Sequence, residues 1–297
     1  MSTQRCGYVA ILGRPNVGKS TLLNRLLGQK VSITSKKPQT TRHRLLGIKT
    51  RGDSQILYVD TPGIHGDEPR AINRYMNRSA LSVIRDVDLV VFIVDRTAWT
   101  SDDQLVAEAL ARFRGPIIVM VNKIDQLKDK TALLPALQKL HARFPQAEIV
   151  PASALAGDNV ERLEEIIGKD LPEGPFYFPE DQVTDRTERF MVSEIVREKL
   201  MRQLGEEIPY AVTIQVERFE TTADVTQIDV TIFVERDGQK AIIIGKKGAR
   251  LKQIGSDARR DIEELLSGKV MLTTWVKVKS GWSDDDRALK SLGYDDV

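Results

Sequence analysis

Eight residues near the N-terminus, Gly13–Ser20, match the phosphate-binding pattern G-x-x-x-x-G-K-[ST] at every position. The five apolar residues before them, Tyr8–Leu12, predict a buried strand, and the periodic run Lys19–Leu27 predicts a helix. This order directs backbone N–H groups and the positive end of a helix at a pyrophosphate. We expect Lys19 to reach the β- and γ-phosphates and the Ser20 hydroxyl to bind Mg²⁺. A plain glycine-rich turn is the alternative for this motif taken alone.

The first 170 residues alternate short Val- and Ile-rich runs with helical patterns. Such alternation predicts an α/β domain with a mostly parallel, doubly wound sheet, in which ligands bind beyond the carboxyl ends of the strands. The expected strands are Tyr8–Leu12, Leu45–Thr50, Gln55–Val59, Leu89–Val94, Ile117–Val121 and Glu148–Val150. The expected helices are Lys19–Leu27, Ile72–Val83, Asp102–Phe113, Thr131–Phe144 and Val160–Gly168.

The 297 residues are enough for two domains. Three prolines and a glycine between Leu171 and Pro179 indicate a linker. We therefore expect a nucleotide-binding domain at residues 1–172, a linker at 173–187 and a smaller α+β domain at 188–297. The elements expected after the linker are helix Glu188–Leu204, strand Ala211–Phe219, strand Gln227–Glu235, helix Gln239–Ile244, helix Ala249–Leu266 and strand Val270–Lys279.

The C-terminal residues predict one more helix. It is expected to begin near Ser283, with Ser283 and Asp286 forming a capping box. Trp275 and Trp282 are expected to pack in the core or between the domains.

The composition is that of a soluble globular protein, with 41% apolar and 29% charged residues. The single cysteine, Cys6, excludes an internal disulfide and suits a reducing compartment. The apolar runs are too short to span a bilayer, and no long apolar segment precedes Gly13. We therefore expect a cytoplasmic protein without a secretory signal.

Three further short motifs each follow an expected strand. Asp60–Gly63 offers a carboxylate that can hold Mg²⁺ through water and a glycine N–H that can sense a γ-phosphate. In Asn122–Asp125, the Asp125 carboxylate can accept hydrogen bonds from both N1–H and N2–H₂ of guanine. Ser153-Ala154 lies where a backbone N–H can donate to guanine O6. Each motif alone also fits an ordinary turn or helix cap. Four motifs in this order at strand ends predict a guanine-nucleotide site.

The candidate nucleotide-binding residues follow from these motifs. They are Gly13, Asn16, Val17, Gly18, Lys19, Ser20, Thr21, Asp60, Thr61, Pro62, Gly63, Asn122, Lys123, Asp125, Ser153 and Ala154.

A polar stretch without periodicity, Ser35–Arg44, lies between the first two motifs. A loop threonine that ligates Mg²⁺ only when the γ-phosphate is present makes a switch by ordering the loop. We favour Thr41 over Thr40 for this role, so the expected metal-binding residues are Ser20, Thr41 and Asp60. The commoner interpretation of the basic residues in this stretch is a solvated loop face, and His43 is interpreted as an exposed loop histidine.

The candidate catalytic residues are Lys19, Thr41 and Gly63, because they would neutralise or sense charge on the transferred phosphoryl group. Ile64 stands where Ras-like enzymes place a water-orienting glutamine, and its side chain cannot form hydrogen bonds. We therefore expect slow intrinsic hydrolysis. Asn16 resembles the phosphate-loop asparagine of relatives that K⁺ stimulates; alternatively, it only fixes the loop by hydrogen bonds.

The second domain contains a basic segment, residues 238–256, with five basic side chains and no acid. Within it, Gly245–Gly248 forms a G-x-x-G turn between two expected helices, which brings the backbone close to a nucleic-acid backbone. A plain glycine turn with solvated lysines is the alternative. The apolar residues expected to line a groove for bases are Ile242, Ile244, Leu251 and Ile254. The candidate RNA-binding residues are Gly245, Lys246, Lys247, Gly248, Arg250 and Lys252.

The nucleotide motifs together are similar to those of the translation-factor-related small GTPases of bacteria. Residues Ile242–Gly248 resemble the loop of a K-homology (KH) RNA-binding domain. The C-terminus of the Era GTPases is resembled by Val276–Trp282, Asp284–Asp286, Leu289 and Leu292–Tyr294. This resemblance covers nearly the whole chain and implies a P-loop GTPase domain followed by a KH-type domain.

The resemblance also implies ligands and partners. GTP, GDP and Mg²⁺ are the implied cofactors, with K⁺ as a further candidate. The implied activity is a cytoplasmic GTPase that binds small-subunit (16S) ribosomal RNA near its 3′ end and assists 30S subunit assembly and rRNA maturation.

Two classes of function remain open. In the first, the nucleotide state controls engagement of RNA or the ribosome. In the second, an RNA-binding assembly module holds GTP mainly as a sensing ligand, which Ile64 keeps open. We expect a monomer that binds no DNA. Peripheral association with the inner face of the cell membrane stays open, although no amphipathic basic helix stands out.

Overall fold

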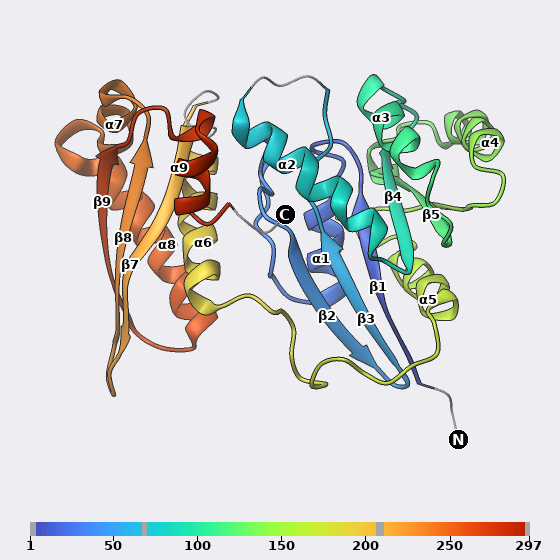
Figure 1. Cartoon of the computed structure of the whole chain (residues 1–297), viewed down its shortest axis with the longest axis horizontal. Coiled ribbons are helices and arrows are strands. Elements are labelled where there is room, and N and C mark those ends of the chain that lie inside the picture. The colour runs from blue at the N-terminus through green and yellow to red at the C-terminus, as the bar shows by residue number, and fades with distance from the viewer. Residues whose placement is uncertain (1–3, 67–69, 206–210, 295–297) are drawn as a thin grey trace.

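The computed structural model describes residues 4–66, 70–205 and 211–294. The outermost residues of the two predicted domains, 1–3 and 295–297, lie outside these ranges. Within them, two sheets with their own helices lie side by side, and the segment after α5 runs from one unit to the other (Figure 1).

The first sheet has the strand order β2-β3-β1-β4-β5-β6. Every neighbouring pair is parallel except β2 and β3, which form an antiparallel hairpin at one edge. The prediction of a mostly parallel, doubly wound sheet is therefore confirmed. The strands are β1 (Arg5–Leu12), β2 (Leu45–Arg51), β3 (Ser54–Asp60), β4 (Leu89–Asp95), β5 (Ile117–Asn122) and β6 (Glu148–Pro151).

Helices cover both faces of this sheet because both faces of its strands are apolar. Val9 and Ile11 of β1 share a core with α1 and α5, whereas Ala10 and Leu12 share a core with α2, α3 and α4. The helix α3 ends three residues before its predicted end at Phe113. The helices are α1 (Lys19–Leu27), α2 (Ala71–Ser82), α3 (Ser101–Leu110), α4 (Leu133–Arg143) and α5 (Val160–Asp170).

The second sheet has the order β7-β8-β9, with β7 antiparallel and β9 parallel to β8. The helices α6 and α8 pack on one face of this sheet through residues such as Val196 and Ile262. This arrangement agrees with the predicted KH-type α+β domain. Its elements are α6 (Glu188–Gln203), β7 (Val212–Thr221), β8 (Thr226–Val234), α7 (Asp237–Ile244), α8 (Ala249–Leu266), β9 (Val270–Val278) and α9 (Asp286–Ser291).

The predicted start of the last helix is wrong. Asp285 caps α9, because its carboxylate accepts hydrogen bonds from the backbone N–H groups of Arg287 and Ala288. Ser283 is buried instead, and its hydroxyl donates to Glu235 at 2.6 Å. The neighbouring Trp282 is fully buried, and this anchors the turn in the core and places the helix start further along the chain.

Two predictions about apolar side chains are also wrong. Trp275 is 45% exposed, because it alternates with the buried Val276 and therefore points to the face of β9 opposite α6 and α8. Ile254 does not line a groove: it is fully buried on the inner face of α8.

The segment 173–187, predicted as the linker, is fastened to the first sheet. The buried side chain of Gln55 bonds the backbone of Tyr177 and Phe178. Further along, the Thr184 hydroxyl donates to Leu46 O at 2.7 Å, beside the edge strand β2. The linker is therefore an ordered strap along the edge of the sheet.

Candidate functional site

A cavity of about 480 Å³ opens at the carboxyl ends of the strands of the first sheet. Most of the predicted nucleotide-binding residues line it, and Thr41 does so as well. The lining residues among those predicted are Asn16, Gly18, Lys19, Ser20, Thr21, Gly63, Asn122, Lys123, Asp125 and Ala154. The other predicted residues, Gly13, Val17, Asp60, Thr61, Pro62 and Ser153, are outside the lining, and several of them contact it from behind.

The phosphate loop is shaped by a close approach that only glycine allows. Gly18 has a φ of 106°, and a Cβ atom there would lie 2.4 Å from the side-chain nitrogen of Asn122. A similar Cβ at Gly63 would lie 2.6 Å from the backbone nitrogen of Pro15. The phosphate loop and the D-x-x-G motif, Asp60–Gly63, therefore meet backbone to backbone, where N–H groups can face phosphate oxygens.

Lys19 is the buried cation of the loop. Its Nζ donates to Gly13 O at 3.0 Å and to Arg14 O at 2.9 Å, which holds the ammonium inside the turn. Burial lowers the pKa of Lys19 to about 8, and the nearby Asp60 carboxylate offsets part of this effect. A phosphate group bound in the loop would stabilise the charged form of this lysine.

Three oxygen-bearing side chains converge as a Mg²⁺ site requires. The Ser20 hydroxyl lies 2.7 Å from the Thr41 hydroxyl and donates to Asp60 Oδ2 at 2.8 Å. Asp60 is fully buried, and its Oδ1 accepts no hydrogen bond from any described residue. Burial raises the pKa of Asp60, opposed by the Lys19 charge and by hydroxyl donors, so a bound cation would relieve the cost of its charge.

The opposite end of the cavity holds the residues predicted to bind the base. Asn122 ties two loops together, because its Nδ2 donates to Val17 O at 2.7 Å and its Oδ1 accepts from Ala154 N at 2.9 Å. The Ser153 hydroxyl donates to Asp125 Oδ1 at 2.6 Å and so orients that carboxylate. The backbone N–H of Ala154 points at Asn122, so the guanine O6 contact expected from this N–H is not prepared here.

Several supporting residues were not found from the sequence. Ser32 donates to Asp60 Oδ2 at 2.9 Å, and Arg25 of α1 donates to the backbone of Ala154 and Leu155. The Asp95 carboxylate accepts a hydrogen bond from Lys123 at 2.7 Å. Burial opposes the charge of this carboxylate, but hydrogen bonds from Lys123 and Arg96 outweigh burial and lower the pKa of Asp95. Only Asp95 carried a signal, because it ends a strand beside the other motifs.

The two candidate switch threonines have different surroundings. The Thr40 hydroxyl turns back into its own loop, donating to Lys37 O at 2.6 Å and lying 2.7 Å from the Ser35 hydroxyl. The Thr41 hydroxyl instead faces Ser20, as described above. This difference favours Thr41 as the ligand for Mg²⁺.

The interpretation of this loop as a solvated face is wrong at Arg42 and His43. Arg42 is fully buried and donates to Val212 O at 2.6 Å, at the start of β7. His43 stacks on Tyr294 with ring centroids 4.5 Å apart, and it also contacts Phe190. The cause is the second domain, which packs onto the loop and supplies these partners.

Asn16 connects the phosphate loop to the loop that carries Thr41. Its Nδ2 donates to Lys36 O at 2.9 Å, which is the loop-fixing hydrogen bond that was the alternative to a K⁺ site. Ile64 is buried and presents only an apolar side chain next to the D-x-x-G motif. The residue that follows this motif therefore has no polar side-chain atom to orient water.

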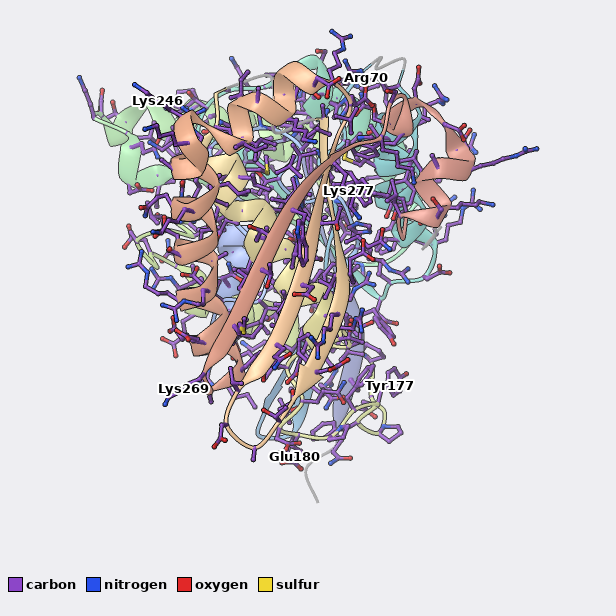
Figure 2. The ribbon with its side chains drawn as sticks, turned by 90° about the vertical axis from the view of Figure 1, so that its left-hand side faces the viewer. Arg70, Tyr177, Glu180, Lys246, Lys269 and Lys277 are labelled. Carbon is purple, nitrogen blue, oxygen red and sulfur yellow. The ribbon has the colours of Figure 1, made fainter. Side chains whose placement is uncertain are left out.

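The G-x-x-G turn projects from one end of α8, with Lys246 at the outer edge of the molecule (Figure 2). Gly245, Lys247 and Gly248 all have positive φ, and a Cβ at Gly245 would lie 2.8 Å from that of Arg250. The basic side chains predicted to bind RNA are exposed here, and Ile242 is 44% exposed beside them. The exposed basic residues are Lys246, Lys247, Arg250 and Lys252.

Comparison with known proteins identifies two family models in the chain. The model described as "50S ribosome-binding GTPase" matches residues 8–123, and the KH-domain model matches residues 207–283. Among curated proteins, GTPase Era of Pseudomonas putida (strain W619) is 60% identical over 293 residues, covering 99% of this chain and 98% of that protein. GTPase Era of Ectopseudomonas mendocina is 60% identical over 98% of this chain and 97% of that protein.

Solved structures agree. A single-residue variant of Aquifex aeolicus Era bound to GDP·AlF₄⁻ superimposes with a TM-score of 0.95 at 40% identity, over 98% of this chain and 99% of that one. A structure of Era with MgGDPNP and nucleotides 1506–1542 of 16S ribosomal RNA matches with the same TM-score, identity and coverage. Across the described ranges, no helix has the length and apolar character needed to cross a membrane.

Proposed function

Because this chain belongs to the Era family of GTPases, we propose that it is a GTP-hydrolysing switch that binds small-subunit ribosomal RNA near its 3′ end. We further propose that it assists biogenesis of the 30S subunit and maturation of its rRNA. We also propose that it acts in the cytoplasm, as a monomer that binds no DNA. Peripheral membrane association stays an untested prediction.

One observation carries this proposal: a guanine-nucleotide cavity and an exposed, basic G-x-x-G turn occur in one chain. The relative crystallised with MgGDPNP and 16S nucleotides superimposes on both parts at once. Since the two parts belong to separate sheets, we propose the division predicted above, with a nucleotide domain at 1–172, a strap at 173–187 and an RNA-binding domain at 188–297.

In the nucleotide domain, we propose that the protein acts on GTP by positioning and electrostatics. Lys19 and the loop N–H groups hold the phosphates, Asp125 reads the base, and Gly63 senses the γ-phosphate. Ser20, Thr41 and Asp60 would hold Mg²⁺, which supplies charge neutralisation at the phosphates. With Ile64 unable to orient water, the intrinsic rate should be low, and K⁺ near Asn16 is a candidate activator.

The proposal is tested by RNA binding with a paired charge reversal. Lys246→Asp with Lys247→Asp removes two phosphate contacts and adds repulsion, so 16S 3′-end RNA should bind more weakly by about 2 kcal/mol or more, about thirtyfold. The slope of affinity against salt should fall by about two contacts. GTP binding and basal hydrolysis should not change, because neither lysine lines the nucleotide cavity.

A matched control reverses two exposed lysines elsewhere in the same domain. Lys269 lies at the other end of α8 from the turn (Figure 2), and Lys290 lies on α9. Lys269→Asp with Lys290→Asp changes the net charge equally but should retain RNA binding. If both double variants bind RNA equally well, the G-x-x-G segment is a plain turn.

The alternative, an assembly module that holds GTP mainly as a sensing ligand, rests on Ile64. It predicts that purified 30S subunits leave the rate of phosphate release unchanged. A rise in phosphate release when subunits are added supports the switch.

A further inference from the structure

The loop that carries Thr41 is held from the other domain. We define the switch loop as residues 30–43, between α1 and β2. Its partner is α6, the first helix of the C-terminal domain, which lies on the side facing the N-terminal domain (Figure 1). Side chains of α6 bind the backbone of the loop at two residues, one on each side of the loop tip, residues 35–39.

The first place is Thr34. Its backbone N–H donates to Glu198 Oε1 at 3.0 Å, and its carbonyl accepts from Arg202 Nε and Nη2, both at 3.1 Å. The Thr34 hydroxyl accepts a further bond from Arg202 at 3.1 Å. Both backbone polar groups of this residue are therefore satisfied by side chains of α6.

The second place is Thr40, the residue before the Mg²⁺ ligand. Its carbonyl accepts from Arg197 Nη2 at 2.5 Å. Arg197 is 2% exposed, and Glu194, one turn earlier, accepts from its Nε at 2.8 Å. A residue of the same helix therefore fixes the orientation of the Arg197 guanidinium, which points at the Thr40 carbonyl.

The carboxylate of α6 that contacts the loop, that of Glu198, is equally constrained. Glu198 is fully buried, and it accepts from Lys30 and Arg202 as well as from Thr34. A buried carboxylate needs all of these partners, because a buried charge without them is strongly unfavourable. If the switch loop moved away from α6, the Glu198 carboxylate would lose hydrogen-bond partners or become exposed to solvent.

From these contacts we propose that α6 is a clamp that positions Thr41 for GTP hydrolysis, with Arg197, Glu198 and Arg202 as positioning residues. The clamp holds the backbone on both sides of the loop tip, so Thr41 stays beside Ser20 and Asp60. The C-terminal domain thereby forms part of the nucleotide site without touching the nucleotide. This role rests on GTP hydrolysis by the chain and does not depend on RNA recognition.

The test compares two exposed arginines on the same helix. Arg202 donates hydrogen bonds to Thr34 of the switch loop. Arg189 donates instead to the carbonyls of Val216 and Glu217, inside the C-terminal domain. Arg202→Ala should raise the Mg²⁺ concentration for half-maximal GTP hydrolysis several-fold and lower kcat. Arg189→Ala should change neither, and GDP should bind both full-length variants as it binds the unaltered chain.

The GDP measurement separates positioning from simple structural support, because only the γ-phosphate state needs Thr41. Arg202→Lys retains one charged donor and should restore part of the Mg²⁺ response. The proposal is overturned if Arg202→Ala and Arg189→Ala have the same Mg²⁺ response. It is also overturned if Arg202→Ala weakens GDP binding as much as GTP hydrolysis. All measurements are made without RNA, so failure of RNA recognition would leave their result intact.

Discussion

Nucleotide binding by this GTPase should weaken as the pH rises above about 8, because Lys19 must be protonated to bind phosphate. Burial lowers its pKa to about 8 in the free protein, and the Asp60 charge offsets only part of that effect. A bound phosphate places negative charge around the ammonium and raises the pKa again. Binding therefore takes up a proton above this pH, and linkage then requires the affinity to fall.

The size of the effect follows from the pKa. A group with a pKa of about 8 is about nine-tenths protonated at pH 7 and about one-tenth protonated at pH 9. The affinity for GDP should therefore fall about tenfold over this range, which is about 1.4 kcal/mol. At pH 8.5, each binding event should take up about 0.8 proton by the same relation.

Calorimetric titration with GDP in two buffers of different ionisation enthalpy measures this proton uptake directly. Lys19→Arg is the control, because arginine keeps its charge throughout the range. Any pH dependence that persists in this variant comes from other groups. If the unaltered protein takes up no proton at pH 8.5 and binds GDP equally at pH 7 and pH 9, Lys19 is charged in the free protein and the reasoning fails.

Two further predictions concern the ends of the nucleotide cavity. Asp125→Asn should change the base preference from guanine to xanthine, because the amide can donate to the O2 that xanthine carries. Nucleotide competition measures this preference, and a variant that still prefers GTP would mean that Asp125 does not read the base. Asn16→Ala should leave nucleotide binding largely intact and abolish K⁺ stimulation of hydrolysis. Asn16→Gly also lacks the amide, but glycine suits the positive φ at this position and so controls for backbone strain. Equal hydrolysis rates in K⁺ and Na⁺ for the unaltered chain would contradict the K⁺ hypothesis.

Local sequence was sufficient for the parts of the molecule that a few consecutive residues build. The phosphate loop is predictable because glycine, lysine and serine at fixed spacing leave few backbone paths around a pyrophosphate. The parallel sheet is predictable because strands buried on both faces need continuous apolar runs, as at Leu89–Asp95. The G-x-x-G turn is predictable because its glycines adopt positive φ between two helices.

Errors arose where a residue's partner comes from a distant part of the chain. Arg42 has the composition of a solvated loop residue, yet it is fully buried against the start of β7. Ser283 and Asp286 have the spacing of a capping box, but the burial of Trp282 moved the helix start and left Asp285 as the cap. Trp275 is a different case: the alternation along β9 is local, and it places this side chain on the exposed face of the strand.

The clamp on the switch loop shows what only the tertiary structure decided. Thr34 and Arg202 each carry no signal in the sequence, and 168 positions separate them. Sequence spacing determines contacts within a turn, a helix or a strand, since covalent geometry limits the distance between near neighbours. Contacts between two folded units depend instead on how both surfaces pack. The chain alone therefore predicted where GTP and RNA should bind, and the packing of the two domains determined which residues contact the switch loop.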